Sequence, residues 1–183
     1  MNNRIANLSY LNQLLGAAVV LMVWACEPSR PALESYRLEK GPVRTEELVR
    51  KELTQFAREQ IGSRYKSAGK DQRGFDCSGF VIYVYKSFRI PMAASSQEQA
   101  KGLDTIGLKD ARPGDLLFFG SGERISHVGI ISQIKGNQVK LIHSTSSRGV
   151  IEEDIMRSDY WVRRIRKVVS LESYLRSSSI SSL

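Results

Sequence analysis

The spacing of the apolar residues changes near residue 115, and this change restricts the possible folds more than any other feature of the sequence. Between residues 46 and 61, apolar side chains recur at helical spacing, and the run SGFVIYVYKSF at 78–88 is apolar enough for a buried helix. From residue 115 onward, the apolar residues fall in short runs with period two, separated by turn residues. Helices followed by an antiparallel sheet predict an α+β domain.

Local signals bound the predicted elements. Thr45 is a favourable N-cap for the first helix, and Pro91 stops the second. A polar loop at 63–74 joins these helices, and a short third helix begins at Ser95 or Ser96. The predicted strands cover residues 115–119, 126–134, 138–144, 149–155 and 161–169. The serine-rich residues 170–183 are predicted to form a flexible tail.

The composition suits one globular domain with a basic surface. The chain has 183 residues, of which 42% are hydrophobic and 25% charged. Its formal net charge of +8 favours an anionic partner such as nucleic acid, anionic lipid or an acidic cell-wall polymer. The one dense basic cluster, RRIRK at 163–167, alternates with apolar residues. This favours the solvated outer face of a strand over a nucleic-acid-binding arm, and leaves a specific polyanion site open.

Residues 1–25 are predicted to be a signal peptide. A weakly basic start precedes the uncharged run at 14–25, which is shorter than the roughly 20 apolar residues of a membrane-spanning helix. The run ends in VWAC, which resembles a bacterial lipobox with Cys26 as the lipidated residue, although Trp24 is bulkier than that position usually carries. Cleavage after Ala25 without lipidation, or a buried helix with an incidental cysteine, are the alternatives.

A lipid on Cys26 would anchor the protein to a membrane that faces the cell wall, in the bacterial cell envelope. Residues 26–44 contain three of the five prolines and no clear periodicity. They are therefore predicted to be an extended tether between the membrane and a domain at 45–169.

The two cysteines of the chain also bear on the chemistry of Cys77. If Cys26 carries a lipid on its sulfur, Cys77 has no disulfide partner, and a free thiol in an oxidising compartment is expected to have a function. One remaining cysteine and two histidines at irregular spacing argue against a zinc site. No metal or cofactor is expected.

Cys77 and the two histidines can form a nucleophile, a base and an orienting group. A helix that starts at Cys77 favours the thiolate. His127 opens one predicted strand and His143 ends the next, with a hairpin turn at 136–137 between them, so both come to the same end of the sheet. Taken singly, each of these residues has an ordinary structural explanation. Together they make cysteine catalysis as good an explanation as a purely structural role, and both explanations stay open at this point.

Four ordered stretches carry a resemblance to a known family: GFDCSGFV, ARPGDLLFF, SHVGI and IHSTSSRGV. On these motifs, residues 47–169 resemble the NlpC family of bacterial cell-wall cysteine peptidases, which belongs to the papain-like superfamily. The resemblance implies N-terminal helices packed on a small antiparallel sheet. It also implies that Cys77 is the nucleophile, His127 the general base and His143 the orienting residue.

The resemblance extends to substrate-binding positions. Tyr65, twelve residues before Cys77, matches a family tyrosine near the oxyanion. Where family members recognise a free N-terminal amine, the positions of Asp76, Ser78 and Ser96 line the subsite, although all three can also be helix caps. The sequence departs from the family pattern at residues 67 and 68, where bulky and glycine residues are usual, and in the loop MAASS, which lacks an arginine.

The sequence as a whole predicts a lipid-anchored cysteine endopeptidase that acts on peptidoglycan stem peptides, at the γ-D-glutamyl–diamino-acid bond or at D,D cross-links. A monomer with no nucleic-acid partner is expected. A papain-like amidase or acyltransferase that uses the same three residues is the alternative in chemistry. A non-catalytic cell-wall-binding lipoprotein is the alternative of another class.

Overall fold

A computed structural model describes residues 45–101 and 103–180, with side chains up to residue 177. The predicted signal peptide (1–25), the lipidation site Cys26 and the tether (26–44) lie outside the described residues. Within the described part, no helix is long and apolar enough to cross a membrane. The helices are α1 (Glu46–Arg58), α2 (Cys77–Ser87), α3 (Ser96–Gln99), α4 (Asp159–Val162) and α5 (Leu171–Ile180), with 3-10 turns at Leu108–Asp110 and Ile155–Arg157.

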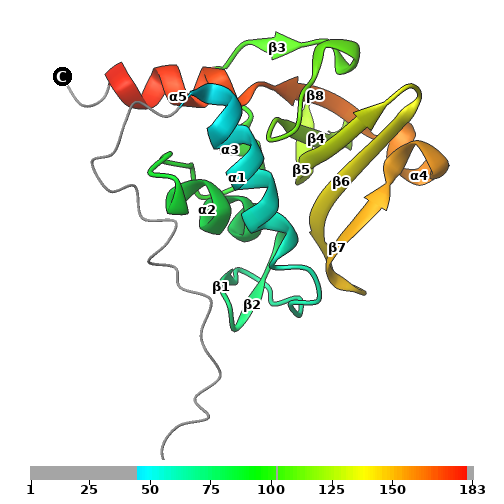
Figure 1. The fold of residues 1–183 in the computed structure, drawn as a ribbon. Coiled ribbons are helices and arrows are strands. Elements are labelled where there is room, and N and C mark those ends of the chain that lie inside the picture. The colour runs from blue at the N-terminus through cyan, green and yellow to red at the C-terminus, as the bar shows by residue number, and fades with distance from the viewer. Residues whose placement is uncertain (1–44, 102, 181–183) are drawn as a thin grey trace, which may run out of the picture. The chain divides into compact units, whose positions relative to one another are not determined.

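The described strands form a small hairpin and a six-stranded sheet in which all neighbouring strands are antiparallel (Figure 1). The order in the larger sheet is β3-β8-β4-β5-β6-β7, so the C-terminal strand β8 is inserted between β3 and β4. The strands are β1 (Lys70–Asp71), β2 (Gly74–Phe75), β3 (Thr105–Ile106), β4 (Leu116–Ser121), β5 (Arg124–Lys135), β6 (Gln138–Thr145), β7 (Gly149–Asp154) and β8 (Ile165–Val169). The predicted α+β class is confirmed.

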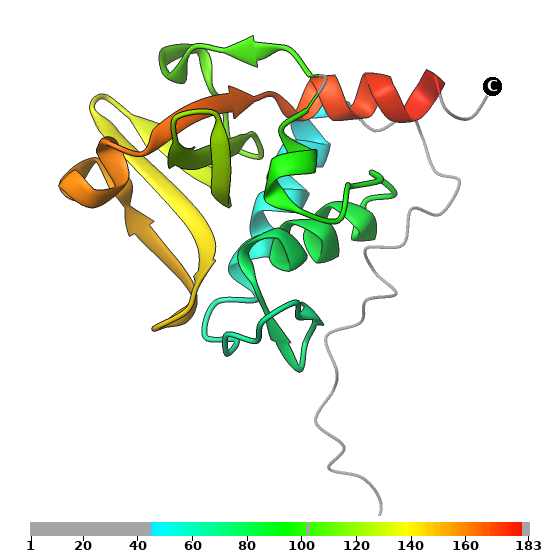
Figure 2. The ribbon, with the colours of Figure 1, turned by 180° about the vertical axis from the view of Figure 1, so that it is seen from behind.

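Successive side chains of β4 point alternately into two separate apolar clusters. Leu116 and Phe118 pack in the larger cluster, which also contains residues of α1 and α2, and these helices lie on one side of the sheet (Figures 1 and 2). Leu117 and Phe119 belong to the second cluster, on the opposite side of the strand. All four side chains are fully buried. The continuous apolar run LLFF at 116–119 is therefore the pattern of a strand that is covered on both faces.

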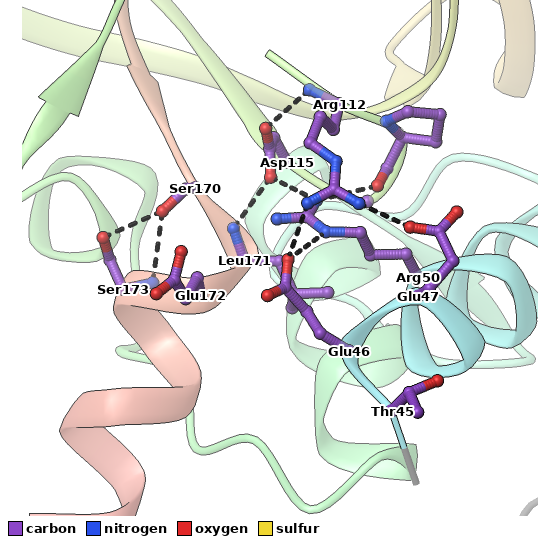
Figure 3. Close-up of polar contacts among 12 residues, drawn as sticks. Thr45, Glu46, Glu47, Arg50, Arg112, Asp115, Ser170, Leu171, Glu172 and Ser173 are labelled. Atoms are coloured by element: carbon purple, nitrogen blue, oxygen red, sulfur yellow. Dashed lines mark hydrogen bonds and ion pairs between the residues drawn. The ribbon is translucent and has the colours of Figure 1, made fainter. Parts of the chain in front are cut away.

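A buried ion pair between Arg50 and Asp115 joins α1 to the turn before β4, and a hydrogen bond to the same aspartate joins α5 (Figure 3). Arg50 Nη1 donates to Asp115 Oδ1 at 2.6 Å, and the same oxygen accepts from the backbone N–H of Leu171 at 2.9 Å. Asp115 Oδ2 accepts from the N–H of Arg112 at 2.7 Å, and Arg50 Nε donates to Glu46. Removing one member of such a buried pair typically costs about 3–5 kcal/mol because a charge is left without a partner. The aspartate of the RPGD motif is therefore structural.

Two predictions for the C-terminal region are wrong. Residues 161–164 were expected in the last strand, but α4 occupies Asp159–Val162 and β8 begins only at Ile165. Instead of a flexible tail from residue 170, the chain forms α5, in which Leu171 and Tyr174 are buried. The hydroxyl of Tyr174 donates to the carbonyl of Gln99 at 2.8 Å. Although this segment is rich in serine, its apolar residues recur at helical spacing, which is the pattern of a helix packed on the domain.

Candidate active site

Cys77 is the first residue of α2, and its neighbours explain why the helix begins there. Asp76 is the N-cap, and its Oδ1 accepts from the N–H of Gly79 at 2.6 Å and from the hydroxyl of Ser78 at 3.0 Å. Gly79 lies against the preceding loop, because a Cβ added there would lie 1.9 Å from the carbonyl oxygen of Gly69. The DCSG motif therefore fixes the position of the thiol through a cap and a close backbone contact.

The surroundings of Cys77 favour the thiol over the thiolate. Burial is the largest influence and raises the pKa of the thiol, and the charge of Asp76 raises it further. Backbone N–H groups of Val128, Ser78 and Cys77 act in the opposite direction but do not outweigh the burial. The side chain is partly buried, and the cysteine is free. A base is therefore needed to convert this thiol to a thiolate near neutral pH.

The two histidines lie together at one end of the sheet, as the sequence predicted. His127 on β5 and His143 on β6 are joined by a hydrogen bond of 2.8 Å between Nε2 of the former and Nδ1 of the latter. His143 is fully buried. Gly129 makes room for this arrangement, because a Cβ there would lie 2.9 Å from Cβ of His143 and 2.7 Å from the Leu141 side chain.

Glu153 on β7 contacts the far side of His143. Its Oε1 lies 3.0 Å from Nε2 of His143, and it also accepts from Nε1 of Trp161 at 3.0 Å. Arg148 donates to both carboxylate oxygens, at 3.0 and 2.9 Å. The hydrogen bond from His143, followed by those from Arg148 and Trp161, lowers the pKa of Glu153 to about 2 against the effect of burial. Glu153 is therefore a carboxylate at neutral pH.

This carboxylate determines the proton positions along the row of histidines. A carboxylate only accepts, so Nε2 of His143 carries hydrogen and its Nδ1 accepts from Nε2–H of His127. Nδ1 of His127 is then the free acceptor of the ring. Burial and the neighbouring His143 lower the pKa of His127 to about 3, although Glu153 raises it. The neutral imidazole is consequently available as a base.

Trp161 covers the histidine pair. Its ring stacks on His127 at 4.8 Å with an interplanar angle of 26°, and meets His143 edge-on at 5.1 Å. Sequence reasoning missed both Trp161 and Glu153, since the first was assigned to a strand and the second to an ordinary strand edge. The register of β6 and β7 would have indicated Glu153. Because His143 pairs with Ile151, Glu153 is the diagonal neighbour of His143 on the same face of the sheet.

These groups line one pocket of about 530 Å³. Cys77, His127 and Tyr65 contribute to it, so the structure brings together three of the predicted site residues, while His143 lies buried behind His127. The remaining wall includes Glu153, Trp161, Arg164 and the β6–β7 turn. Among the described residues, no cluster of three or more His, Cys, Asp or Glu side chains could hold a metal ion.

The three positions predicted for an amine subsite are not in the pocket wall. Asp76 is engaged by its capping bonds, and Ser78 is buried and bonded to it. Ser96 is buried at the first position of α3, whose cap is Ser95. Capping thus accounts for Asp76, whereas neither serine is a cap.

Residues 62–170 match the sequence model described as the NlpC/P60 family. Over 113 residues the chain is 35% identical to the murein DD-endopeptidase MepS/murein LD-carboxypeptidase of Escherichia coli K12, a match that covers 60% of this chain and 57% of that protein. The crystal structure of the NlpC/p60 domain of the peptidoglycan hydrolase SagA is similar with a TM-score of 0.56 and 30% identity, over 67% of this chain and 98% of that one. RipD of Mycobacterium tuberculosis, described as a non-catalytic NlpC/p60 domain protein adapted to peptidoglycan binding, is similar in fold with a TM-score of 0.54 and 20% identity, over 67% and 97% of the two chains.

Proposed function

The chain belongs to the NlpC/P60 family, and from this premise we propose that it is a cysteine endopeptidase that hydrolyses peptidoglycan stem peptides. Its relatives include a murein endopeptidase and a peptidoglycan hydrolase. The observation that carries the proposal is the hydrogen-bonded row His127–His143–Glu153, which reaches the pocket lined by Cys77. The row supplies a neutral base with a defined tautomer to the pocket that the partly buried thiol of Cys77 also lines.

The chemistry follows from these roles. Nδ1 of His127 takes the thiol proton, and the Cys77 sulfur attacks the carbonyl carbon of the scissile amide. The backbone N–H of Cys77 and the hydroxyl of Tyr65 stabilise the resulting oxyanion, and one such donor is typically worth about 3 kcal/mol. His127 then protonates the leaving amine, which leaves a thioester on the enzyme. His127 next activates a water molecule that hydrolyses the thioester, which restores the thiol and releases the acid.

Glu153 is a positioning residue in this scheme. It does not face the scissile bond but holds the proton of His143 on Nε2, which in turn directs the proton of His127 to Nε2. When His127 becomes an imidazolium, the carboxylate stabilises the positive charge through His143. Trp161 restricts water around the same rings, which strengthens these interactions.

The remaining roles are part of the same proposal. Asp76, Ser78 and Ser96 recognise the free amine of the substrate, although none of the three lines the pocket. Cys26 carries a lipid that anchors the enzyme in the bacterial envelope, and residues 26–44 give it reach. The bond cleaved is the γ-D-glutamyl–diamino-acid bond or a D,D cross-link.

Two alternatives use the same fold. An amidase or acyltransferase would form the same thioester but release an intact stem peptide or pass the acyl group to another acceptor. A non-catalytic wall-binding protein, as RipD is described to be, would bind peptidoglycan without cutting it. The hydrogen bond between His127 and His143, together with a pocket that both Cys77 and His127 line, favours an enzyme.

The test is digestion of purified sacculi by the full-length protein with its thiol reduced, followed by mass spectrometry of the products. We expect new amine and carboxyl termini within the stem peptides, and no such products from the Cys77→Ala variant with an unchanged melting temperature. A folded, reduced wild-type protein that binds sacculi but releases no fragment would support the wall-binding alternative. Release of whole stem peptides from the sugar would support the amidase.

A further inference from the structure

A basic hollow adjoins the catalytic pocket. It has a volume of about 330 Å³ and is lined by Gly120, Ser121, Arg163, Arg164 and Arg166. Arg164 also lines the catalytic pocket, so the two cavities share one side chain. A ligand in the catalytic pocket therefore needs to extend only past Arg164 to reach the other two guanidinium groups.

The three arginines of the hollow have no acidic partner among the described residues. None of them forms an ion pair within the described residues. Most of the other described arginines do pair with an acid, namely Arg50, Arg58, Arg73, Arg112, Arg148, Arg157 and Arg176. The positive charge of the hollow is therefore available to an external anion.

Neutral contacts hold these guanidinium groups in place. Arg163 Nε donates to the carbonyl of Asp159 at 3.0 Å, and Arg164 Nη1 to that of Tyr160 at 3.0 Å. Arg164 also lies over the Tyr160 ring, with Cζ 3.8 Å from the centroid. Arg166 Nη1 contacts the carbonyl of Ile165 at 2.9 Å. One nitrogen of each guanidinium group is held by a hydrogen bond to the backbone, and the other N–H groups remain available to a ligand.

The local backbone explains why three nearby arginines share one hollow. Arg163 and Arg164 follow directly after the short helix α4. Arg166 is the extra residue of a bulge in β8, because Phe118 pairs with Lys167 whereas Phe119 pairs with Ile165. A bulge redirects a side chain that regular alternation would place elsewhere. The cluster is therefore not the plain outer strand face that its sequence pattern predicted.

We propose that Arg163, Arg164 and Arg166 form a subsite for the free carboxylates of the peptide substrate. This inference rests on the proposed function. A γ-linked glutamyl residue leaves its α-carboxyl group free, and a diamino acid brings a second carboxyl group close to the bond that is cut. Guanidinium groups bind carboxylates through paired N–H···O bonds, which makes arginine better suited to this role than lysine. The subsite orients the stem peptide so that its scissile carbonyl meets Cys77.

The experiment measures binding apart from catalysis. Full-length Cys77→Ala protein is titrated calorimetrically with a synthetic stem peptide that has free carboxylates, and with the same peptide after amidation. We expect amidation to weaken binding about tenfold, as for the loss of a charge-assisted contact worth about 1.4 kcal/mol. Adding Arg163→Gln and Arg166→Gln should reduce this ratio to about three or less, because Arg164 alone then remains of the subsite. Adding Arg176→Gln, an exposed arginine of α5 that pairs with Glu172, should leave the ratio unchanged.

The outcomes separate this inference from the proposed function. Equal binding of the two peptides, or an amidation ratio that is undiminished in the double arginine variant, would overturn the subsite. The same variants are incubated with vesicles that contain anionic phospholipid. Vesicle binding that is lost in the double variant, together with no discrimination between the peptides, would assign the arginines to a membrane surface and overturn the carboxylate subsite. Absence of hydrolysis by the protein with Cys77 intact would contradict the endopeptidase while the binding ratio still decides the subsite.

Discussion

Glu153 Oε1 lies 3.0 Å from Nε2 of His143, and the two residues are diagonal neighbours across β6 and β7. This contact adds to the hydrogen-bonded pair of histidines a third residue that the sequence analysis did not indicate. Because a carboxylate can only accept, it specifies a single tautomer for both histidines. It also places a negative charge beside the histidine pair, where the proposed reaction forms an imidazolium.

Glu153→Gln should therefore lower kcat about tenfold with little change in KM. The amide oxygen can still accept from His143, but the charge that stabilises protonated His127 is lost, so the penalty falls on the transition state. Steady-state kinetics with a stem peptide measures both parameters. Glu152→Gln is the matched control, because Glu152 is the adjacent residue of β7 and pairs with Arg58. An equal loss in both variants, or a change confined to KM, would argue against the positioning role.

Asp76→Asn should shift the alkylation of Cys77 to lower pH. The charge of Asp76 raises the pKa of the thiol, so its removal lowers that pKa, whereas asparagine still caps α2. The rate of iodoacetamide modification is followed against pH by mass spectrometry of the Cys77 peptide. Asp71→Asn, which changes an aspartate of the β1–β2 hairpin paired with Arg73, should leave the profile in place. A midpoint that stays or rises in Asp76→Asn would contradict this account.

Gly129→Ala should reduce kcat by at least tenfold while the protein still folds. The new methyl group would lie 2.9 Å from Cβ of His143, so the histidine row or the strand must shift. Overpacking of this kind costs about 1–3 kcal/mol of stability, which urea unfolding can measure beside the kinetics. At Gly107 the one close approach of an added Cβ is 2.8 Å to Oδ2 of Asp110, at the end of a flexible side chain, and Gly107→Ala should be nearly neutral. Wild-type kcat in Gly129→Ala would show that this spacing is not required.

The fold should lose stability in mild acid because of His127. Its pKa is lowered to about 3 in the folded protein, against 6.5 ordinarily, so the unfolded chain binds the proton more readily. The contribution of His127 is complete above pH 6.5 and declines as the pH falls towards 3, at no more than about 1.4 kcal/mol per pH unit for one proton. Glu153 also contributes to stability, because folding lowers its pKa to about 2. That contribution begins to fall only below pH 4.5, the ordinary pKa of the group. In urea unfolding, the difference between wild type and His127→Gln should shrink between pH 6.5 and 5, and a constant difference would contradict the assignment.

The sequence predicted those parts of the structure that depend on local patterns. Apolar periodicity located α1 and the central strands, and the hairpin between β5 and β6 was enough to bring His127 and His143 together. Contacts that depend on register or on short helices were not predictable in this way. Glu153 becomes visible only when Ile151 is known to oppose His143, and Trp161 reaches the histidines only because α4 interrupts the expected strand.

The C-terminal helix gives a last prediction, because its serine-rich sequence suggested a flexible tail. Leu171 is fully buried, Tyr174 is 5% exposed, and the N–H of Leu171 bonds to the buried Asp115. Ending the chain after residue 170 should therefore lower the free energy of unfolding by at least about 3 kcal/mol, from the loss of two buried side chains and one hydrogen bond to a charge. Ending it after residue 177 keeps all of these contacts and should cost little. Urea unfolding of both truncated proteins tests this, and equal midpoints would mean that α5 adds nothing to the stability of the domain.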